Sequence, residues 1–371
     1  MTKLKNEQET LQAIEGDLQC SGCAAVLKFS PGTKSLKCQS CNTTTMIEVS
    51  ESVIEEMSLQ DFISDHSSEE EYKVIVTVQC EGCGAAATLK PNITSDSCPF
   101  CGLSLVIKNG TTNSILKPKS ILPFKIKQTE AQASFKRWIK SLWFAPNELQ
   151  EHARSESYLN GMYIPYWTYD AAAESSYLGQ RGTNYTETES YTASENGKNV
   201  QRTRTVTKVR WQSVSGNVSR KFDDVLVIAS KSLPEEYAQE LEPWDLKELV
   251  PFDEKFLSGF RTESYQIDVS QGLPKAKIIM DESIRRDVCR HIGGDHQEIN
   301  SLDTSFSQVT FKHTLLPIWI NTYRFNNRPY TFLVNGRTGE VQGERPYSWI
   351  KIALLIIMVS ILAAYLSNKV A

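Results

Sequence analysis

The sequence contains CSGC at residues 20–23 and CQSC at 38–41, and the same arrangement returns sixty residues later as CEGC at 80–83 and CPFC at 98–101. Each set reads CxxC, fourteen residues, CxxC, and Pro31 repeats as Pro91 with the same shift. A CxxC turn directs two sulfurs at one point, and two such turns complete a tetrahedron of zinc ligands. The spacing therefore predicts two zinc ribbons, related by an internal repeat.

Disulfides and redox dithiols are the competing interpretations of these cysteines. The first twelve residues are charged where a secretory signal needs an apolar core, so we expect a reducing compartment. Thioredoxin-type CxxC motifs do not occur in paired sets with equal spacers. We expect two structural Zn²⁺ ions, because protein sulfurs fill every ligand position and leave none for water or substrate. The eight expected ligands are Cys20, Cys23, Cys38, Cys41, Cys80, Cys83, Cys98 and Cys101.

Charge decides between a protein and a nucleic acid as the partner of the ribbons. The 371-residue chain has a formal net charge of -4, and it has no arginine before Arg137. Residues 48–73 contain nine acids and one lysine, which would repel a phosphate backbone. Bidentate arginine is the commonest base-reading side chain, so its absence argues against sequence-specific DNA contact. Protein contact is favoured, with nucleic-acid binding as the alternative.

The region from residue 120 to 345 is rich in aromatic and strand-forming residues. Apolar residues at helical spacing predict one helix after Thr129, ending before Pro146, and a second from Pro274 to Ile292, ending at two glycines. The segment IPYW at 164–167 resembles LPIW at 316–319, which indicates either a duplicated β-unit or two edge strands that begin alike.

The strongest strand signal is a hairpin over residues 183–211 around Asn196-Gly197. A two-residue turn pairs positions whose numbers sum to 393, which places Glu189 opposite Arg204 and Tyr191 opposite Arg202. Such a ribbon is polar on both faces, so we expect it to project from the body. We interpret it as a self-compensated, solvated hairpin, with a docking surface for a partner or for lipid headgroups as the alternative.

No catalytic motif is recognisable: the sequence lacks a P-loop, GxSxG, HExxH and GxGxxG. His291 and His296 lie near Cys289, but the glycines between the histidines break any shared helical face. We expect a local structural role for the histidines and a small buried hydrophobe at Cys289. The sequence therefore predicts a protein that is not an enzyme.

The C-terminal residues 350–366 read IKIALLIIMVSILAAYL, with Lys351 as the only charge. As a helix this segment spans about 25 Å, near the lower limit for a hydrocarbon core of about 30 Å. We expect a transmembrane helix over 349–367, that is, a tail anchor in a single-pass membrane protein. Arg337, Arg345 and Lys351 precede the span and only Lys369 follows, which predicts the bulk of the chain on the cytoplasmic side.

Several longer motifs carry a family resemblance that covers nearly the whole chain. Besides the paired ribbons they are LPFKIKQTEAQASFKRWIKSLWFAPNEL, YIPYWTYDAAAESSYLGQRG, FLSGFRTESY, IRRDVCRHIGGDHQ and LLPIWINTYRFNNRPYTFLVNGRTGEVQGERPYSWIKI. In these the chain resembles the bacterial TFIIB-type double zinc-ribbon membrane proteins. That family is often labelled primosomal N′ helicase-like, but no helicase motor motif is present here. The resemblance implies partners that are phage-shock protein A-like or flotillin-like.

The expected fold class is multidomain: two small β zinc ribbons, a β-rich α+β body and one C-terminal transmembrane helix. The expected function is a non-enzymatic, tail-anchored membrane adaptor that recruits such partner proteins, and the alternative is a membrane-tethered nucleic-acid-binding zinc-ribbon protein. The expected boundaries are 1–15 for an N-terminal tail, 16–50 and 74–110 for the two ribbons, 51–73 for an acidic linker, 120–345 for the body with its projecting hairpin 183–211, and 349–367 for the span.

Overall fold

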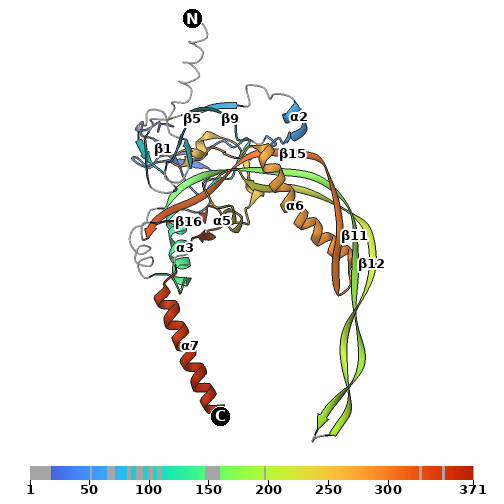
Figure 1. The fold of residues 1–371 in the computed structure, drawn as a ribbon. Coiled ribbons are helices and arrows are strands. Elements are labelled where there is room, and N and C mark those ends of the chain that lie inside the picture. The colour runs from blue at the N-terminus through green and yellow to red at the C-terminus, as the bar shows by residue number, and fades with distance from the viewer. Residues whose placement is uncertain are drawn as a thin grey trace.

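The structure is a computed structural model. It describes residues 18–50, 52–64, 72–81, 85–88, 95–98, 100, 103–106, 111–146, 159–195, 198–325, 328–344 and 347–370, and every structural statement below concerns these residues. Over these ranges the chain is rich in β-strand (Figure 1).

The N-terminal residues form a three-stranded antiparallel sheet of β1 (Leu27–Phe29), β2 (Ser35–Cys38) and β3 (Thr44–Met46). This sheet packs directly on the body. The Phe29 ring meets the Phe256 ring edge-on with centroids 5.1 Å apart, and the Phe29 amide donates to the Ser258 carbonyl at 3.0 Å. Its small core is therefore continuous with that of the body.

The segment expected to be an acidic linker also contacts the body. It contains β4 (Met57–Ser58) and α2 (Leu59–Ser64), and β4 pairs with residues 310–311 of a long body strand. Phe62 of α2 packs edge-on against Phe311, with ring centroids 5.1 Å apart. An acidic composition does not prevent docking here, because two apolar residues of this short segment, Leu59 and Phe62, face the body.

The segment that repeats the N-terminal cysteine pattern contains short strands. A three-stranded sheet has the order β6 (Ala86–Thr88), β5 (Tyr72–Gln79) and β9 (Thr111–Leu116), and β7 (Ser95–Ser97) pairs with β8 (Ser104–Val106).

The body is a nine-stranded sheet built around three long strands. β11 (Asn160–Glu195) lies between β12 (Lys198–Ile228) and β15 (His296–Phe325), and both neighbours run antiparallel to it. The two similar segments near residues 164 and 316 pair with each other, Ile164 opposite Leu316. The remaining members are β4, β10 (Ser120–Ile121), β13 (Val250–Pro251), β14 (Arg261–Thr262), β16 (Arg328–Asn335) and β17 (Val341–Gly343).

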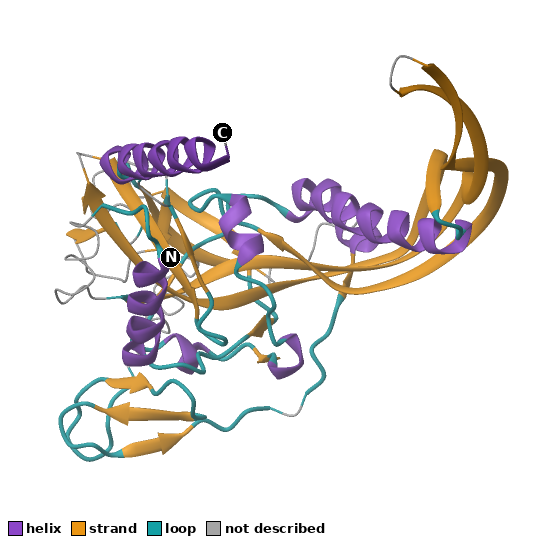
Figure 2. Cartoon of the chain, turned by 90° about the horizontal axis from the view of Figure 1, so that it is seen from below, coloured by secondary structure: helices purple, strands orange, loops and turns teal. Residues whose placement is uncertain are grey.

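Two helices pack on this sheet. α3 (Gln128–Ser141) buries Ala131, Phe135 and Ile139, as its apolar spacing predicts. α6 (Val269–Ile292) begins five residues before the predicted Pro274, because Asp268 caps it by accepting from the Gln271 amide at 2.9 Å. It runs along the long strands (Figure 2) and ends at Gly293 as expected. Short elements complete the body: α5 (Glu235–Glu240) and the 3₁₀ turns η2 (Leu246–Glu248) and η3 (Glu254–Leu257).

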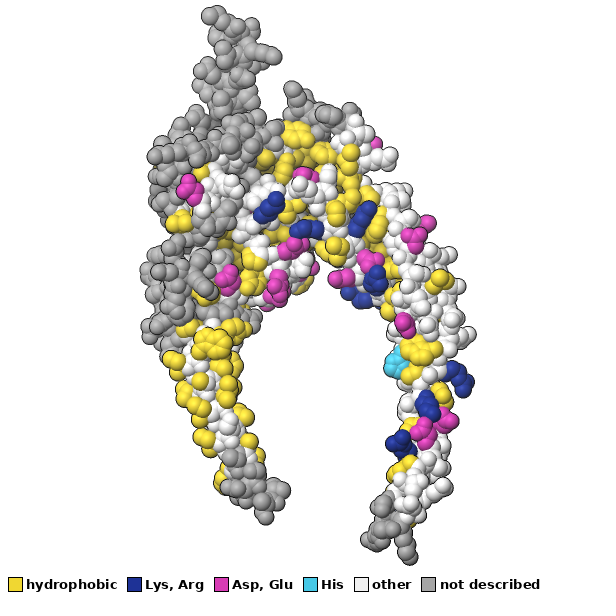
Figure 3. All heavy atoms as spheres, in the orientation of Figure 1, with side chains coloured by type: hydrophobic (Ala, Val, Ile, Leu, Met, Phe, Trp, Pro, Cys, Tyr) yellow, Lys and Arg dark blue, Asp and Glu magenta, His cyan; other side chains and the backbone are white. Residues whose placement is uncertain are grey.

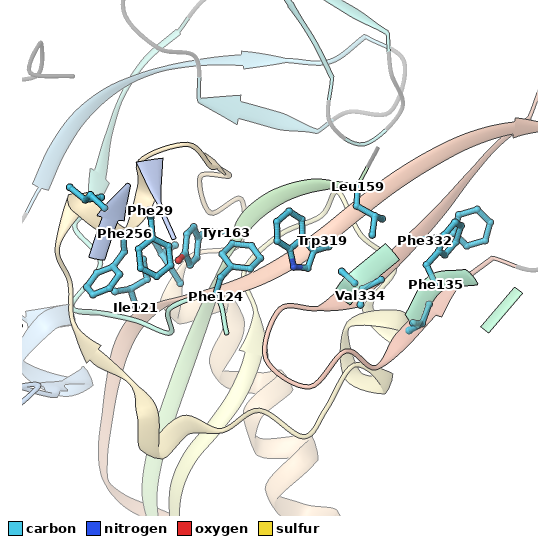
Figure 4. Packing of buried hydrophobic residues seen from close by; sticks show 14 of the residues in the cluster. Phe29, Ile121, Phe124, Phe135, Leu159, Tyr163, Phe256, Trp319, Phe332 and Val334 are labelled. Atoms are coloured by element: carbon cyan, nitrogen blue, oxygen red, sulfur yellow. The ribbon is translucent and has the colours of Figure 1, made fainter. Parts of the chain in front are cut away.

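The core beneath the first sheet is aromatic (Figure 4). Phe124 stacks on Phe260 at 4.3 Å and meets the Tyr163 ring edge-on at 5.1 Å. Phe135 of α3 and Phe332 of β16 extend the cluster, with ring centroids 5.1 Å apart. These contacts join the N-terminal sheet, α3 and the long strands into one packed unit.

The predicted transmembrane helix is wrong. The C-terminal residues form α7 (Trp349–Val370), whose apolar side chains are exposed (Figure 3). Within the described part of the chain, however, no helix is long and apolar enough to cross a membrane. Lys351 interrupts the run and donates from Nζ to the Ala145 carbonyl at 2.7 Å, which ties the first turn to the body. After Lys351 the apolar run from Ile352 to Leu366 covers about 22 Å of a core of about 30 Å.

This finding corrects three connected predictions. The fold class loses its membrane-spanning helix. The prediction of a membrane protein with a transmembrane tail anchor is not supported. The predicted single-pass location, with the bulk of the chain on the cytoplasmic side, is overturned as well.

Candidate metal centre and projecting hairpin

Two tight turns position the first four cysteines. The Cys20 amide donates to the Ala25 carbonyl at 2.8 Å, and the Cys38 amide donates to the Thr43 carbonyl at 2.9 Å. The residue after each pair lies in the left-handed region, with φ 54° at Ala24 and 61° at Asn42. Asparagine tolerates positive φ better than most residues, so the sequence is compatible with this conformation at Asn42, whereas alanine at position 24 gives no such signal.

The four sulfurs of Cys20, Cys23, Cys38 and Cys41 converge, and all lie within 4.8 Å of one another. The Cys20 and Cys41 sulfurs are 3.4 Å apart, and those of Cys23 and Cys38 are 3.5 Å apart. A tetrahedron with Zn–S bonds of about 2.3 Å has edges of about 3.8 Å. Four thiolates at this separation fit a zinc ion, so this set can hold the metal that the sequence predicts.

Hydrogen bonds to Cys20 and Cys41 lower the pKa of these two thiols and favour their thiolate form. The Gly22 amide donates to the Cys20 sulfur at 3.4 Å, and the Thr43 hydroxyl lies 3.0 Å from the Cys41 sulfur. The Thr43 hydroxyl and amide lower the pKa of Cys41 to about 6. Such contacts orient metal ligands and tune their charge. With four protein sulfurs the shell is closed, so the centre suits a structural role.

The second set is only partly described. Cys80 and Cys98 are buried, and their amides donate to the carbonyls of Ala85 at 2.8 Å and Leu103 at 2.7 Å. This repeats the five-residue hydrogen bond that Cys20 and Cys38 make. Cys83 and Cys101 lie outside the described residues.

The histidines near Cys289 are not brought together as metal ligands in the described structure. His291 Nδ1 lies 3.1 Å from the Tyr177 hydroxyl, and His296 Nε2 lies 3.0 Å from the Asn184 amide oxygen. Both therefore join the end of α6 and the start of β15 to β11, in agreement with a local structural role. Cys289 is partly rather than fully buried.

Sequence analysis missed a cluster of acids around a buried lysine. Lys312 Nζ lies 3.0 Å from Glu56 and 2.6 Å from Asp224, and the Asp224 amide donates to Asp170 at 2.6 Å. Burial and the neighbouring Glu56 raise the pKa of Asp170 to about 7, whereas hydrogen bonding with Asp170 and Lys312 lowers the pKa of Glu56 to about 2. Lys312 already supplies a cation here. The residues are too far apart in sequence for a motif to reveal them.

Sequence analysis also did not predict a second buried carboxyl, that of Glu263. Glu263 is 2% exposed, its Oε1 accepts from the Ser232 hydroxyl and from Nε2 of Gln266 at 3.0 Å, and its Oε2 has no partner among the described residues. Burial raises its pKa to about 7. Its own amide donates to the Tyr163 carbonyl of β11 at 3.0 Å, so this carboxyl is fixed to the sheet.

The projecting hairpin forms in the predicted register, with Glu189 opposite Arg204 and Tyr191 opposite Arg202. The third strand, β15, begins at His296 opposite Gly182, so residues 183–195 of β11 pair with β12 alone. We call residues 183–195 and 198–210 the tip of the hairpin. The rest of the two strands, β11 up to Gly182 and β12 from Trp211 onward, is the base. The turn residues Asn196 and Gly197 lie outside the described residues. Figure 1 shows the tip reaching well beyond α6.

Five basic residues and three acids lie on the tip, and ion pairs within it engage two of the basic residues. Lys208 Nζ lies 2.8 Å from Glu187 and 2.7 Å from Glu189, and Arg204 lies 3.3 Å from Glu189. Arg210 lies over the Tyr185 ring at 5.0 Å. Positive and negative side chains are both visible along the hairpin in Figure 3. The other face carries mainly threonines and serines, such as Thr188 opposite Thr205.

Comparisons with known proteins add one relative. The chain is similar to a protein of Bacillus subtilis strain 168 named uncharacterized protein YdjG. The identity is 27% over 243 residues, which is 64% of this chain and 66% of that protein. No family model matches the chain, and no solved structure matches it.

Proposed function

We propose that the chain is a non-enzymatic zinc-ribbon scaffold that recruits partner proteins through its hairpin tip. The observation that carries this proposal is the tip itself: 13 residues of each strand extend past the last residue paired with β15. A two-stranded ribbon is marginally stable alone in water, and the outer edge of each strand is a template for pairing with another chain. On β11 this edge begins after Asn184, whose amide donates to Asp295 at 2.7 Å. The tip adds nothing to the described core, which favours an interaction role.

The metal centres hold the scaffold together in this proposal. Two Zn²⁺ ions bind, one at the first four cysteines and one at Cys80, Cys83, Cys98 and Cys101. The fit of the first sulfur set and the repeated hydrogen bonds at Cys80 and Cys98 support this assignment. Metal analysis of protein purified under reducing conditions should give two ions, and Cys20→Ser or Cys80→Ser should each remove one. One ion or none in the unaltered protein contradicts the duplicated centre.

The nature of the tip surface favours a protein over a nucleic acid. Arg204 and Lys208 are already engaged by Glu187 and Glu189, and the net charge of the chain is -4. A phosphate backbone would have to displace these acids, whereas a protein strand can use the polar faces and the backbone edges together.

A variant in which Asn-Gly replaces residues 183–210 tests the proposal. It joins Gly182 to Trp211, a pair already in register, and leaves every strand pairing of β15 intact. The family resemblance supplies the first probes: purified phage-shock protein A-like and flotillin-like proteins. We expect the full chain to bind at least one of them and the variant to lose that binding while it keeps its zinc and its circular dichroism spectrum.

A charge-swapped control refines the test. Glu187→Lys together with Lys208→Glu keeps the net charge and the cross-strand pair but reverses the pattern. Loss of partner binding in this control assigns docking to the charged face, and retention assigns it to the threonine face. Binding that survives removal of the tip overturns the proposal. So does tip-dependent binding of a labelled DNA or RNA duplex that weakens steeply with salt, which is the signature of phosphate contact.

A further inference from the structure

A cavity of about 370 Å³ lies where α2, β5, β9, β11 and the start of α6 meet. Four of its lining residues are aromatic: Phe62, Tyr72, Trp167 and Tyr265. The other lining residues are Leu116, Asp268, Val269, Ser270 and Gln271. Its volume is within the range of small-molecule sites, which are typically concave, mostly apolar and equipped with a few fixed polar groups.

Hydrogen bonds hold two of the aromatic walls in place. Trp167 Nε1 donates to the Ile267 carbonyl at 2.8 Å, and the Leu116 amide donates to the Tyr265 hydroxyl at 3.1 Å. The Trp167 and Tyr265 ring centroids are 5.1 Å apart. These rings are therefore oriented before any ligand arrives, which reduces the entropy that binding must overcome.

The charge among the described residues that line the cavity is negative. Asp268 is the charged residue in the lining, and among the described residues that line the cavity there is no lysine, arginine or histidine. Behind the wall, His313 lies 4.9 Å from Trp167 and 5.5 Å from Tyr265, measured between ring centroids. Burial lowers the pKa of His313 to about 4, so its imidazole adds no positive charge at neutral pH.

The N-terminus of α6 opposes a cation, but Asp268 outweighs it. A helix N-terminus carries roughly half a positive charge. Asp268 contributes a full negative charge at that position, and its Oδ1 accepts from the Gln271 amide at 2.9 Å. The balance of charge at the cavity is therefore negative.

We infer that this cavity binds a small organic cation with a methylated ammonium group. The faces of aromatic rings attract cations, tryptophan most strongly, and aromatic cages recognise quaternary ammonium groups in this way. Four aromatic rings and one carboxylate supply that chemistry here. This inference is independent of the proposed scaffold role, because the cavity is lined by α2, β5, β9, β11 and the start of α6 and uses no residue of the tip.

Choline and its neutral isostere 3,3-dimethylbutan-1-ol are the probes, titrated into the full zinc-loaded chain and followed by NMR and calorimetry. We expect saturable choline binding and at least about three-fold weaker binding of the neutral isostere, since only choline gains the cation–π and carboxylate terms. Equal affinity for the two probes, or no saturation by choline up to about 20 mM, overturns the inference.

Two variants locate the binding. Asp268→Asn removes the charge and keeps a good N-cap, so α6 should fold while choline affinity falls at least about three-fold. Tyr72→Leu removes one ring of the cage, with Tyr185→Leu on the tip as its matched control. Choline binding that is unchanged in Asp268→Asn and in Tyr72→Leu places the cation elsewhere and contradicts the assignment.

Discussion

The base and the tip of the hairpin are made by the same two strands but differ in what surrounds them. In the base, β11 has β15 on its other edge and α6 against it, and side chains such as Tyr169 and Tyr177 are buried. In the tip, the strands pair only with each other, and Tyr185 and Tyr191 are exposed. Three features mark Gly182 as the boundary. The strand β15 begins opposite it, and the Asp295 amide donates to its carbonyl at 2.9 Å. The neighbouring Arg181 donates to the Ile292 carbonyl at the end of α6.

This contrast shows that strand pairing alone does not decide what a β-ribbon contributes. The base uses its pairing to bury aromatic and aliphatic surface, which is the dominant source of stability. The tip satisfies its charges at the surface, where ion pairs contribute little. Four predictions follow this contrast from the largest expected effect to the smallest.

Truncating a base aromatic should give the largest loss. Trp167 is 1% exposed and donates to the Ile267 carbonyl, so Trp167→Ala removes a large buried ring and leaves that carbonyl without its partner. We expect a loss of about 3 to 5 kcal/mol in the free energy of unfolding. Tyr191→Ala in the tip should change it by less than about 0.5 kcal/mol. Chemical denaturation of both variants measures the difference, and equal losses would erase the distinction between base and tip.

The buried carboxyl of Glu263, whose amide is bonded to β11 of the base, should make stability depend on pH. The folded pKa of Glu263 is raised to about 7 from an ordinary value near 4.5, so the folded state binds a proton more tightly than the unfolded state. The contribution of this group is fully present below pH 4.5 and is lost as pH rises through about 7. Over this window the loss should reach about 3 kcal/mol.

Glu263→Gln isolates that effect. The amide cannot ionise, so denaturation midpoints of this variant should change less between pH 5 and pH 8 than those of the unaltered protein. Glu187→Gln in the tip is the matched control and should leave the pH profile unchanged. A pH profile identical in all three proteins would show that Glu263 does not titrate in this range.

Gly272 should tolerate no side chain, although it lies inside a helix. A Cβ built there would lie 2.4 Å from the Tyr169 hydroxyl and 3.2 Å from the Trp167 ring. Alanine usually stabilises an exposed helix position by up to about 1 kcal/mol relative to glycine. Here we expect Gly272→Ala to destabilise the protein by about 1 to 3 kcal/mol, because the helix must move away from the base. A gain in thermal midpoint would contradict the close packing of α6 on β11.

The ion pairs of the tip should give the smallest effect. Lys208→Ala removes contacts of 2.7 and 2.8 Å with Glu189 and Glu187, yet the side chain is exposed. A double-mutant cycle of Lys208→Ala with Glu189→Ala should give a coupling energy below about 1 kcal/mol, decreasing with added salt. A coupling of several kcal/mol would mean that the tip is supported like the base.

The sequence predicted the parts of this molecule that depend on local spacing. The CxxC spacing predicted that the sulfurs of the first cysteine set, from Cys20 to Cys41, converge. The Asn196-Gly197 turn signal predicted the register that places Glu189 opposite Arg204. The two main helices were also recognisable from their periodicity, although Asp268 starts α6 one turn earlier than Pro274 suggested.

Features built from distant residues could not be predicted in this way. The cluster around Lys312 joins residues from four segments, and the Glu263 carboxyl is bonded by Ser232 from a separate loop. The prediction for the C-terminal segment was wrong for another reason. The sequence shows Lys351 at the start of the apolar run but not that its Nζ is bound to the Ala145 carbonyl of the body.

Native-state hydrogen exchange, resolved along β11 and β12, tests the central claim that base and tip are separate regions of one hairpin. We predict that amides of residues 166–182 exchange only through global unfolding, because strands on both sides of β11 must separate first. Amides of residues 183–195 and 198–210 should exchange through local opening and become protected when a partner binds. Protection that continues unchanged across Gly182 in the free protein would contradict the account.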